Sequence, residues 1–114
     1  MKNKVMRLVI LESPFAGHSH HAIKRNIKYA RTCIADCLRR GEAPFASHLL
    51  YTQDGILRDK VKEEREIGIN AGLAWAEKAQ ATVVYTDLGI SEGMKKGIRH
   101  AIQCGRSVVY RKLK

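Results

Sequence analysis

The sequence predicts one α/β domain, residues 1–114, in which helices cover both faces of a four-stranded parallel sheet. Short runs of apolar, β-branched residues alternate along the chain with longer segments whose apolar residues recur at helical spacing. Because neighbouring parallel strands need a crossover connection, this alternation favours a parallel sheet. The length of 114 residues suits a single core. Right-handed crossovers then favour a three-layer sandwich with the strand order 2-1-3-4.

The first half of the chain is expected to form a strand, a helix and a second strand. The run Val5–Leu11 is apolar and β-branched, which is typical of a buried strand. Apolar residues at helical spacing over 23–38 predict the first helix, and Gly41 follows where a helix C-terminus is expected. We interpret the apolar stretch 45–50 as the second strand. Residues 52–60 lack periodicity and are expected to form an exposed loop.

The second half is expected to add two helices and two strands. Acidic residues near the start of the segment 61–80 suit the dipole of a second helix. The segments 81–86 and 107–110 have the composition of strands, and between them Ser91 is placed to cap a third helix that ends at Gly105. The expected core includes Leu38, Trp75, Tyr85, Met94, Ile98, Ala101 and Ile102.

The composition excludes several classes of protein. With 45% hydrophobic residues, 28% charged residues and two prolines, the chain is neither disordered nor collagen-like. No apolar run approaches the ~18 residues of a membrane span. The basic start at residues 1–4 is not followed by a signal-peptide pattern, so we expect none. The net charge of +10 leaves nucleic acid, a membrane surface or a small anionic ligand as partners.

The three cysteines favour a reducing compartment. Cys33 and Cys37 lie one turn apart on the first predicted helix, and an odd total does not form a disulfide framework. A lone pair is at best half of a zinc site. We therefore expect free thiols in a cytoplasmic protein that uses no metal or other cofactor.

The predicted strand order places a candidate site at the carboxyl ends of strands one and three. Ligands of open α/β sheets bind at the point where the strand order reverses. The first segment there is the turn Ser13-Pro14-Phe15-Ala16-Gly17, whose backbone N–H groups can hold an anion beside a helix N-terminus. Phe15 can stack on a base, and Gly17 allows close approach. The same turn can equally be an ordinary strand–helix connection.

The second segment contains Asp87 and the predicted helix start Ser91-Glu92-Gly93-Met94. Asp87 can accept hydrogen bonds from ribose hydroxyls or act in acid–base chemistry, or it can simply begin a turn. The helix start can hold an anion, although Ser91 would cap the helix in either case.

Histidines and one arginine complete the set of candidate ligand contacts. His48 is expected at the end of strand two, close to the crevice, and Arg65 at the start of the second helix can reach a phosphate. Three further histidines crowd the first loop but lack the rigid spacing of a helical zinc site; they are His18, His20 and His21.

As a set, these motifs resemble the nucleoside 2-deoxyribosyltransferase-like superfamily, which includes many small phage and bacterial proteins. The matching pieces are Ser13-Pro14-Phe15-x-Gly17, Asn26, Ala30, the segment 44–50, Glu64-Arg65-x-x-Gly68, and Ile90-Ser91-Glu92-Gly93-Met94 followed by a strand. The resemblance covers nearly the whole chain. It implies a flavodoxin-like, Rossmann-like sheet with a nucleoside or nucleotide pocket. It also implies homo-oligomers in which a neighbouring subunit closes that pocket.

The chain departs from the enzymes of that superfamily at their catalytic position. Those enzymes cleave an N-glycosidic bond with a glutamate in a Gly-Met-Glu-Leu-Gly-like helix start, whereas this chain has Gly93-Met94-Lys95-Lys96-Gly97. A lysine repels the positive charge that develops at the anomeric carbon. Lys95 would instead favour an anionic nucleotide.

Three functions follow, in order of preference. The first is a protein that binds a nucleoside or nucleotide without cleaving it and so can sequester a nucleotide signal. The second is an N-glycosidase or deoxyribosyltransferase that works through Asp87 and Glu92. The third is a nucleic-acid-binding module. The net charge supports this interpretation, but the chain has no recognised nucleic-acid-binding motif, and its aromatic content of 6% is low for base stacking.

Overall fold

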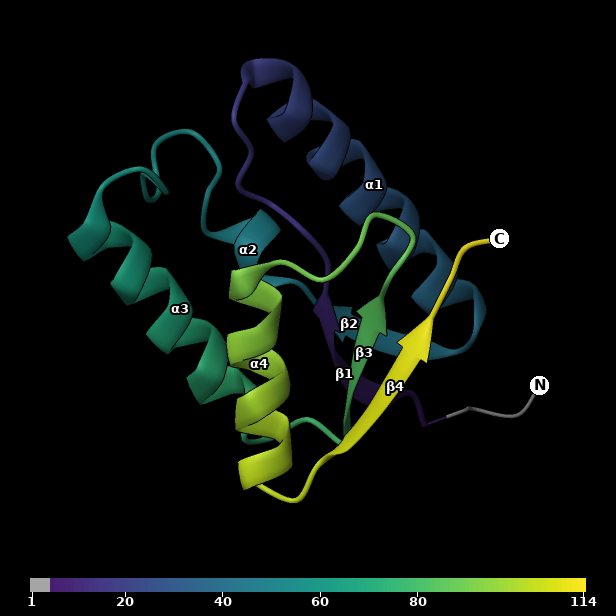
Figure 1. The fold of residues 1–114 in the computed structure, drawn as a ribbon. Coiled ribbons are helices and arrows are strands. Elements are labelled where there is room, and N and C mark those ends of the chain that lie inside the picture. Colours follow the sequence, from purple (N-terminus) through teal and green to yellow (C-terminus); the bar gives the residue numbers. More distant parts are fainter. Residues whose placement is uncertain (1–4) are drawn as a thin grey trace.

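The predicted architecture is confirmed by the computed structural model, which describes residues 5–114. The elements follow the chain as β1 (Arg7–Glu12), α1 (His20–Arg39), β2 (Glu42–Phe45), α2 (Ser47–Leu50), α3 (Lys62–Ala76), β3 (Ala81–Tyr85), α4 (Glu92–Gln103) and β4 (Ser107–Arg111). All strand pairs are parallel, and the strand order is β2-β1-β3-β4 (Figure 1). The basic segment 1–4 lies outside the described residues. Within residues 5–114, no helix has both the length and the apolar character needed to cross a membrane.

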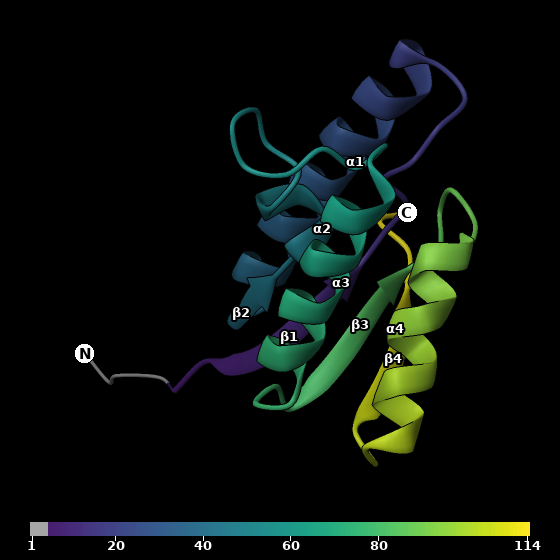
Figure 2. The same cartoon turned by 90° about the vertical axis from the view of Figure 1, so that its left-hand side faces the viewer.

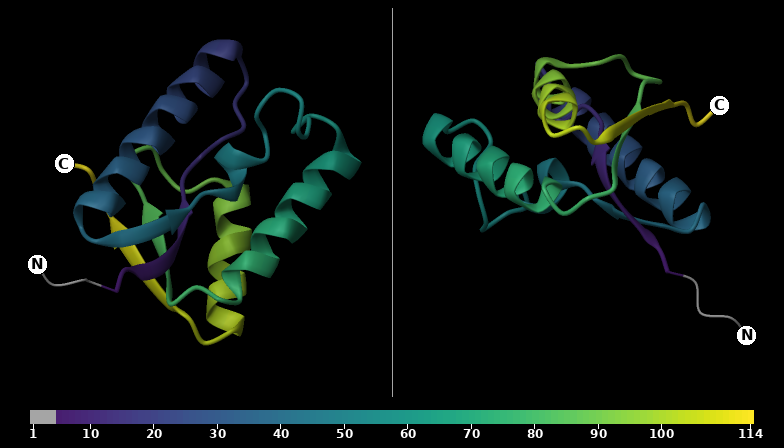
Figure 3. Two further views of the ribbon diagram at one scale, coloured as in Figure 1. Left: turned by 180° about the vertical axis from the view of Figure 1, so that it is seen from behind. Right: turned by 90° about the horizontal axis from the view of Figure 1, so that it is seen from below.

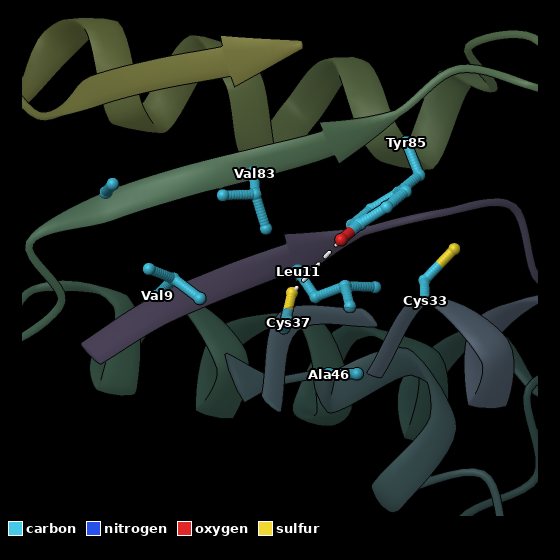
Figure 4. Packing of buried hydrophobic residues seen from close by; sticks show 8 residues of the cluster. Val9, Leu11, Cys33, Cys37, Ala46, Val83 and Tyr85 are labelled. Carbon is cyan, nitrogen blue, oxygen red and sulfur yellow. Dashed lines mark hydrogen bonds between the residues drawn. The ribbon is translucent and has the colours of Figure 1, made fainter. Parts of the chain in front are cut away.

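The molecule has three layers, with α1 on one face of the sheet and α3 and α4 on the other (Figures 2 and 3). Side chains alternate between these two faces along each strand. Val9 and Leu11 of β1, with Val83 and Tyr85 of β3, pack against the buried cysteines of α1 (Figure 4). The intervening residues Ile10, Glu12, Thr82 and Val84 therefore face the opposite side, where α3 and α4 lie. The side chain at the end of β1, that of Glu12, therefore faces α4.

The second strand is shorter and starts earlier than predicted. β2 ends at Phe45, and the segment that we interpreted as the rest of the strand forms the single helical turn α2. Gly41 has a φ of +82°, which lets the chain turn directly from α1 into β2. Pro44 is tolerated because β2 is an edge strand. The apolar run 45–50 is thus divided between a strand end and a helix that packs against α3.

Part of the predicted core is wrong. Tyr85, Met94 and Ala101 are buried as expected, but three large apolar residues are mostly exposed: Leu38 at 52%, Trp75 at 59% and Ile102 at 66%. The ring of Trp75 packs on Phe45 at a centroid distance of 5.6 Å and leaves its other side to solvent. In α4 the buried positions are Met94, Gly97 and Ala101, so Ile102 falls outside the buried stripe.

A polar network links β4 to the opposite edge strand β2 and, through Tyr85, to α1. The guanidinium of Arg111 donates to both carboxylate oxygens of Glu42, at 2.7 and 2.8 Å, and to the hydroxyl of Tyr85 at 3.2 Å. That hydroxyl donates in turn to Asp36 Oδ2 at 2.6 Å. The hydrogen bonds from Arg111 hold the pKa of Glu42 below its usual value, so the pair is ionised in the fold.

Replacement of Arg111 by methionine should be strongly destabilising. The substitution keeps the length of the side chain but leaves the Glu42 carboxylate buried without a partner, which costs about 3 kcal/mol. Urea denaturation of Arg111→Met should show this loss, and the double variant Glu42→Gln/Arg111→Met should recover part of it. The exposed Lys112→Met variant is the matched control; equal stability of Lys112→Met and Arg111→Met would contradict the role of the pair.

Candidate functional site

The central group of the candidate site is the carboxyl of Glu12 at the carboxyl end of the first strand, a residue that is not among the ligand contacts predicted from the sequence. Glu12 is the last residue of β1, and its side chain lies on the face covered by α4. Helix α4 crosses this point at Gly97, where an added Cβ would lie only 2.6 Å from Glu12 Cδ. The absence of a side chain at position 97 is therefore what lets the carboxyl group occupy this space.

The surroundings of Glu12 favour its neutral form. Burial raises the pKa of Glu12 to about 8, and the positive charge of Arg106 offsets only part of this effect. Glu12 is half-buried, and no hydrogen bond to its carboxyl group is formed within residues 5–114. No fully buried side-chain polar atom of the described residues lacks a partner, so the carboxyl oxygens stay open to the adjoining cavity. A neutral carboxyl can both donate and accept, so Glu12 can hydrogen-bond a ligand or deliver a proton to it.

Glu12 opens into a small cavity of about 70 Å³ between β1, α2, α3 and α4. Glycines from two helices make room for it: Gly72 of α3 meets Ser47 closely, and Gly93 and Gly97 come from α4. Lys96 and Arg106 also line the cavity and make it electropositive. The arrangement combines one neutral acid with two cations, of which Arg106 is held by hydrogen bonds to Thr82 and to the Ala76 carbonyl.

Ser13 and His48 form a hydrogen-bonded pair directly beside this cavity. The distance from Ser13 Oγ to His48 Nε2 is 2.7 Å, and Ser13 is buried. His48 lies in α2 and not, as predicted, at the end of a strand. Burial lowers the pKa of His48 to about 4, so the imidazole is neutral at physiological pH. His48 also lines a second cavity of about 50 Å³, which Arg65 borders.

A larger cleft of about 940 Å³ lies between the turn after β1 and the loop before α3. Phe15 and Gly17 line one wall, and Arg65 lines the other. Asn26, which is buried, donates to the Phe15 carbonyl at 3.0 Å and so fixes the turn on α1. At Gly17 an added Cβ would meet Ala22 Cβ at 2.7 Å, which explains the requirement for glycine there.

The three cavities lie in series. Thr52 and Arg65 border both the large cleft and the second cavity, and Ser47 borders both the second cavity and the Glu12 cavity. The three cavities are therefore adjacent to one another, from Phe15 at the outer end of the series to Glu12 at its inner end. We call this series of cavities the crevice. Of the predicted residues, it brings together Ser13, Phe15, Gly17, His48, Arg65 and Gly93, with Pro14 buried in the turn between them.

Asp87 does not belong to the crevice. The Tyr29 hydroxyl donates to Asp87 Oδ1 at 2.6 Å, and the Leu113 amide donates to both carboxylate oxygens at 3.0 and 3.1 Å. These bonds, led by the one from Tyr29, lower the pKa of Asp87. Asp87 lines none of the four cavities described in residues 5–114. It holds the C-terminal segment on α1 and has a structural role here.

Of the residues at the start of α4 that were predicted to contact a ligand, only Gly93 lines one of the cavities described within residues 5–114. Ser91 caps the helix by accepting from the Met94 amide at 3.3 Å, and Met94 is buried in the core. Glu92 and Lys95 are exposed and pair with each other at 3.1 Å. Because Met94, Gly97 and Ala101 face the sheet, Lys95 points away, and Lys96 supplies the charge that lines the cavity.

The histidines of the first loop do not form a cluster with metal-binding geometry. His18, His20 and His21 are exposed, and only His20 lines the cleft. Across the part of the chain that the structure describes, no three His, Cys, Asp or Glu side chains are close enough together to hold a metal ion.

One protein-family model matches nearly the whole described chain. The model of the family described as "Domain of unknown function (DUF7768)" matches residues 7–111, which extend from the first residue of β1 to the last residue of β4. No curated protein and no solved structure matches the chain.

The raised pKa of Glu12 should make stability depend on pH in a specific window. The pKa rises from 4.5 to about 8 on folding, so the folded state binds the proton more tightly. The contribution of Glu12 to stability should therefore be greatest below pH ~4.5 and fall by up to about 4 kcal/mol as the pH rises to ~8. The Glu12→Gln variant should lack this fall when unfolding is measured from pH 5 to pH 9. Glu92→Gln, at an exposed carboxylate, should keep it; a wild-type profile in Glu12→Gln would contradict the assignment.

A side chain at position 97 should be tolerated only when Glu12 is shortened. Gly97→Ala should lose about 1–3 kcal/mol through overpacking, despite the higher helix propensity of alanine. In the Glu12→Ala background the same change should be neutral or stabilising, because the carboxyl no longer occupies the space. Gly93→Ala is the control, since an added Cβ there meets only Ser91 Oγ at 3.9 Å. Equal losses from Gly97→Ala in both backgrounds would show that the contact with Glu12 is not the cause.

Proposed function

The chain belongs to the family described as "Domain of unknown function (DUF7768)", and we propose that it binds a nucleoside or nucleotide in the crevice between Phe15 and Glu12. The observation that carries this proposal is a carboxyl group without a partner at the inner end of a crevice whose outer end is cationic and aromatic. Perturbed pKa values in a cleft are typical of binding and catalytic sites. The resemblance of the sequence to nucleoside 2-deoxyribosyltransferase-like proteins supports the same ligand class.

The charges of the cleft favour a phosphate at its outer end. Arg58 pairs with Glu64, and Arg65 lies 4.0 Å from Asp59. Lys60 and Lys62 also line the cleft and take part in no ion pair within residues 5–114. A phosphate in the cleft would gain charge-assisted hydrogen bonds from such cations. The uncharged part of the ligand would then extend inward, toward His48 and Glu12.

Binding without cleavage is the function that we favour, as in a protein that sequesters a nucleotide. The two carboxylates that the sequence offered for catalysis, Asp87 and Glu92, do not line the crevice: Asp87 accepts from Tyr29, and Glu92 pairs with Lys95. At position 95 a lysine stands where the resembled enzymes have their glutamate. We further propose that the protein is cytoplasmic, which the free cysteines support. The resemblance to nucleoside 2-deoxyribosyltransferase-like proteins supports a homo-oligomer.

One observation favours N-glycosidic cleavage as a second candidate. A carboxyl that stays protonated near neutral pH can donate its proton to a departing base while water adds to the anomeric carbon. In this alternative Glu12 replaces Asp87 and Glu92 as the acid. Release of free base, followed by chromatography and abolished in Glu12→Gln, would establish cleavage over simple binding.

Nucleotide binding should appear as thermal stabilisation. A panel of nucleosides and of mono-, di- and cyclic nucleotides should include a ligand that raises the free energy of unfolding, by ~2.7 kcal/mol at 100 times its Kd. Arg65→Ala should weaken binding of nucleotides but not of the matching nucleosides, and Glu12→Ala should weaken both. Arg99→Ala, an exposed cation of α4, should change neither. The absence of a shift with every compound would refute the proposal.

A further inference from the structure

Helix α1 carries a basic face that takes no part in the crevice. Lys24, Lys28, Arg31 and Arg39 are all exposed and share one side of the helix, and we call these four residues the basic stripe. The opposite side of α1 is buried against the sheet through Asn26, Ala30, Cys33 and Cys37. Figure 1 shows α1 as the outer layer on its side of the sheet, away from α3 and α4. The stripe therefore points to solvent along most of the helix.

The charge of the basic stripe is not neutralised by the protein itself. No ion pair within residues 5–114 involves any of its four members. No acidic residue occurs between Glu12 and Asp36. Asp36, the one carboxylate of α1, is already bonded to Tyr85 and Arg40. Four uncompensated cations on one rigid element produce a local positive potential stronger than scattered surface lysines would.

We propose that the basic stripe binds the phosphate backbone of a nucleic-acid duplex without reading its sequence. From Lys24 to Arg39 the helix rises about 22 Å, at ~1.5 Å per residue. A duplex presents one negative charge per ~1.7 Å of its axis, so a straight row of cations of this length meets several phosphates. Contacts to phosphates position a protein on a duplex but carry no sequence information.

The other residues of this helix face distinguish a duplex from other polyanions. The exposed side of α1 presents no Phe, Tyr or Trp ring for base stacking, only the imidazoles of His20 and His21 at its first turn. Tyr29 is held by its hydrogen bonds with Asp87. Apolar residues that insert would strengthen binding to a membrane surface, and Leu38 is the only large one exposed on α1. The inference stands independently of nucleotide binding, because none of the four residues of the stripe lines the crevice.

Fluorescence anisotropy with a labelled duplex of mixed sequence tests the proposal. Four phosphate contacts predict a slope of about −3 to −4 for log K against log salt, or roughly 100-fold weaker binding between 50 and 200 mM. The triple variant Lys24→Gln/Lys28→Gln/Arg31→Gln should lose most of this slope. The matched control removes three exposed cations elsewhere, in Lys78→Gln/Arg99→Gln/Lys112→Gln, and should keep it. Circular dichroism and Tm verify that both variants fold.

Several results would overturn the proposal. Equal losses in the two triple variants would mean that net charge alone, and not the stripe, attracts the duplex. Tighter binding to single strands of the same length, or to vesicles containing phosphatidylserine, would assign the stripe to another partner. If the protein does not bind the duplex at 50 mM salt, a duplex is not the partner of the basic stripe.

Discussion

The contact between Glu12 and Gly97 is the constraint on which the candidate site depends. Helix α4 crosses the end of β1 at a position without a side chain, and the carboxyl group occupies the space that a side chain would need. Arg106 closes the same corner: its guanidinium donates to Thr82 Oγ1 at 3.0 Å and to the Ala76 carbonyl at 2.8 Å. One residue thereby connects β3, the end of α3 and the start of β4. The close approach of α4 to the end of β1 therefore fixes the packing at this corner and also removes water from around the Glu12 carboxyl.

The two faces of the sheet treat buried polar groups in opposite ways. On the α1 face, the carboxylate of Glu42 is fully paired with Arg111, and its pKa is lowered by that pairing. On the α4 face, Glu12 has no hydrogen-bond partner within the described chain, and burial raises its pKa to about 8. The paired carboxylate of Glu42 serves the fold, whereas the Glu12 carboxyl, which no protein group engages, is free to hydrogen-bond a ligand. The direction of the pKa shift, lowered at Glu42 and raised at Glu12, therefore distinguishes the structural ion pair from the candidate ligand site.

Sequence patterns predicted the features that depend on local periodicity. The parallel sheet, its strand order, the cap at Ser91 and the turn from Ser13 to Gly17 all follow from short-range signals. The features that depend on contacts between distant segments were missed, above all Glu12, whose burial is created by α4. One signal was available: a glycine inside an amphipathic helix costs about 1 kcal/mol, and Gly97 lies on the buried stripe of α4, which implies that another group fills its place. Lys95 was misplaced for a related reason, because the rotation of α4 is set by Met94 and Ala101.

The excess positive charge of the chain is divided between groups with different roles. Arg40, Arg58, Lys95 and Arg111 are engaged in ion pairs, so they do not contribute to a free cationic surface. The outer cleft keeps Lys60 and Lys62, and α1 keeps its stripe. The inner end of the crevice adds two groups that are neutral near neutral pH, the Glu12 carboxyl and the His48 imidazole, to the cations Lys96 and Arg106. The neutral groups can hydrogen-bond an uncharged polar part of a ligand, while the cations at both ends favour an anion. A nucleotide has both an anionic part and an uncharged hydrogen-bonding part, whereas an inorganic anion has only the first.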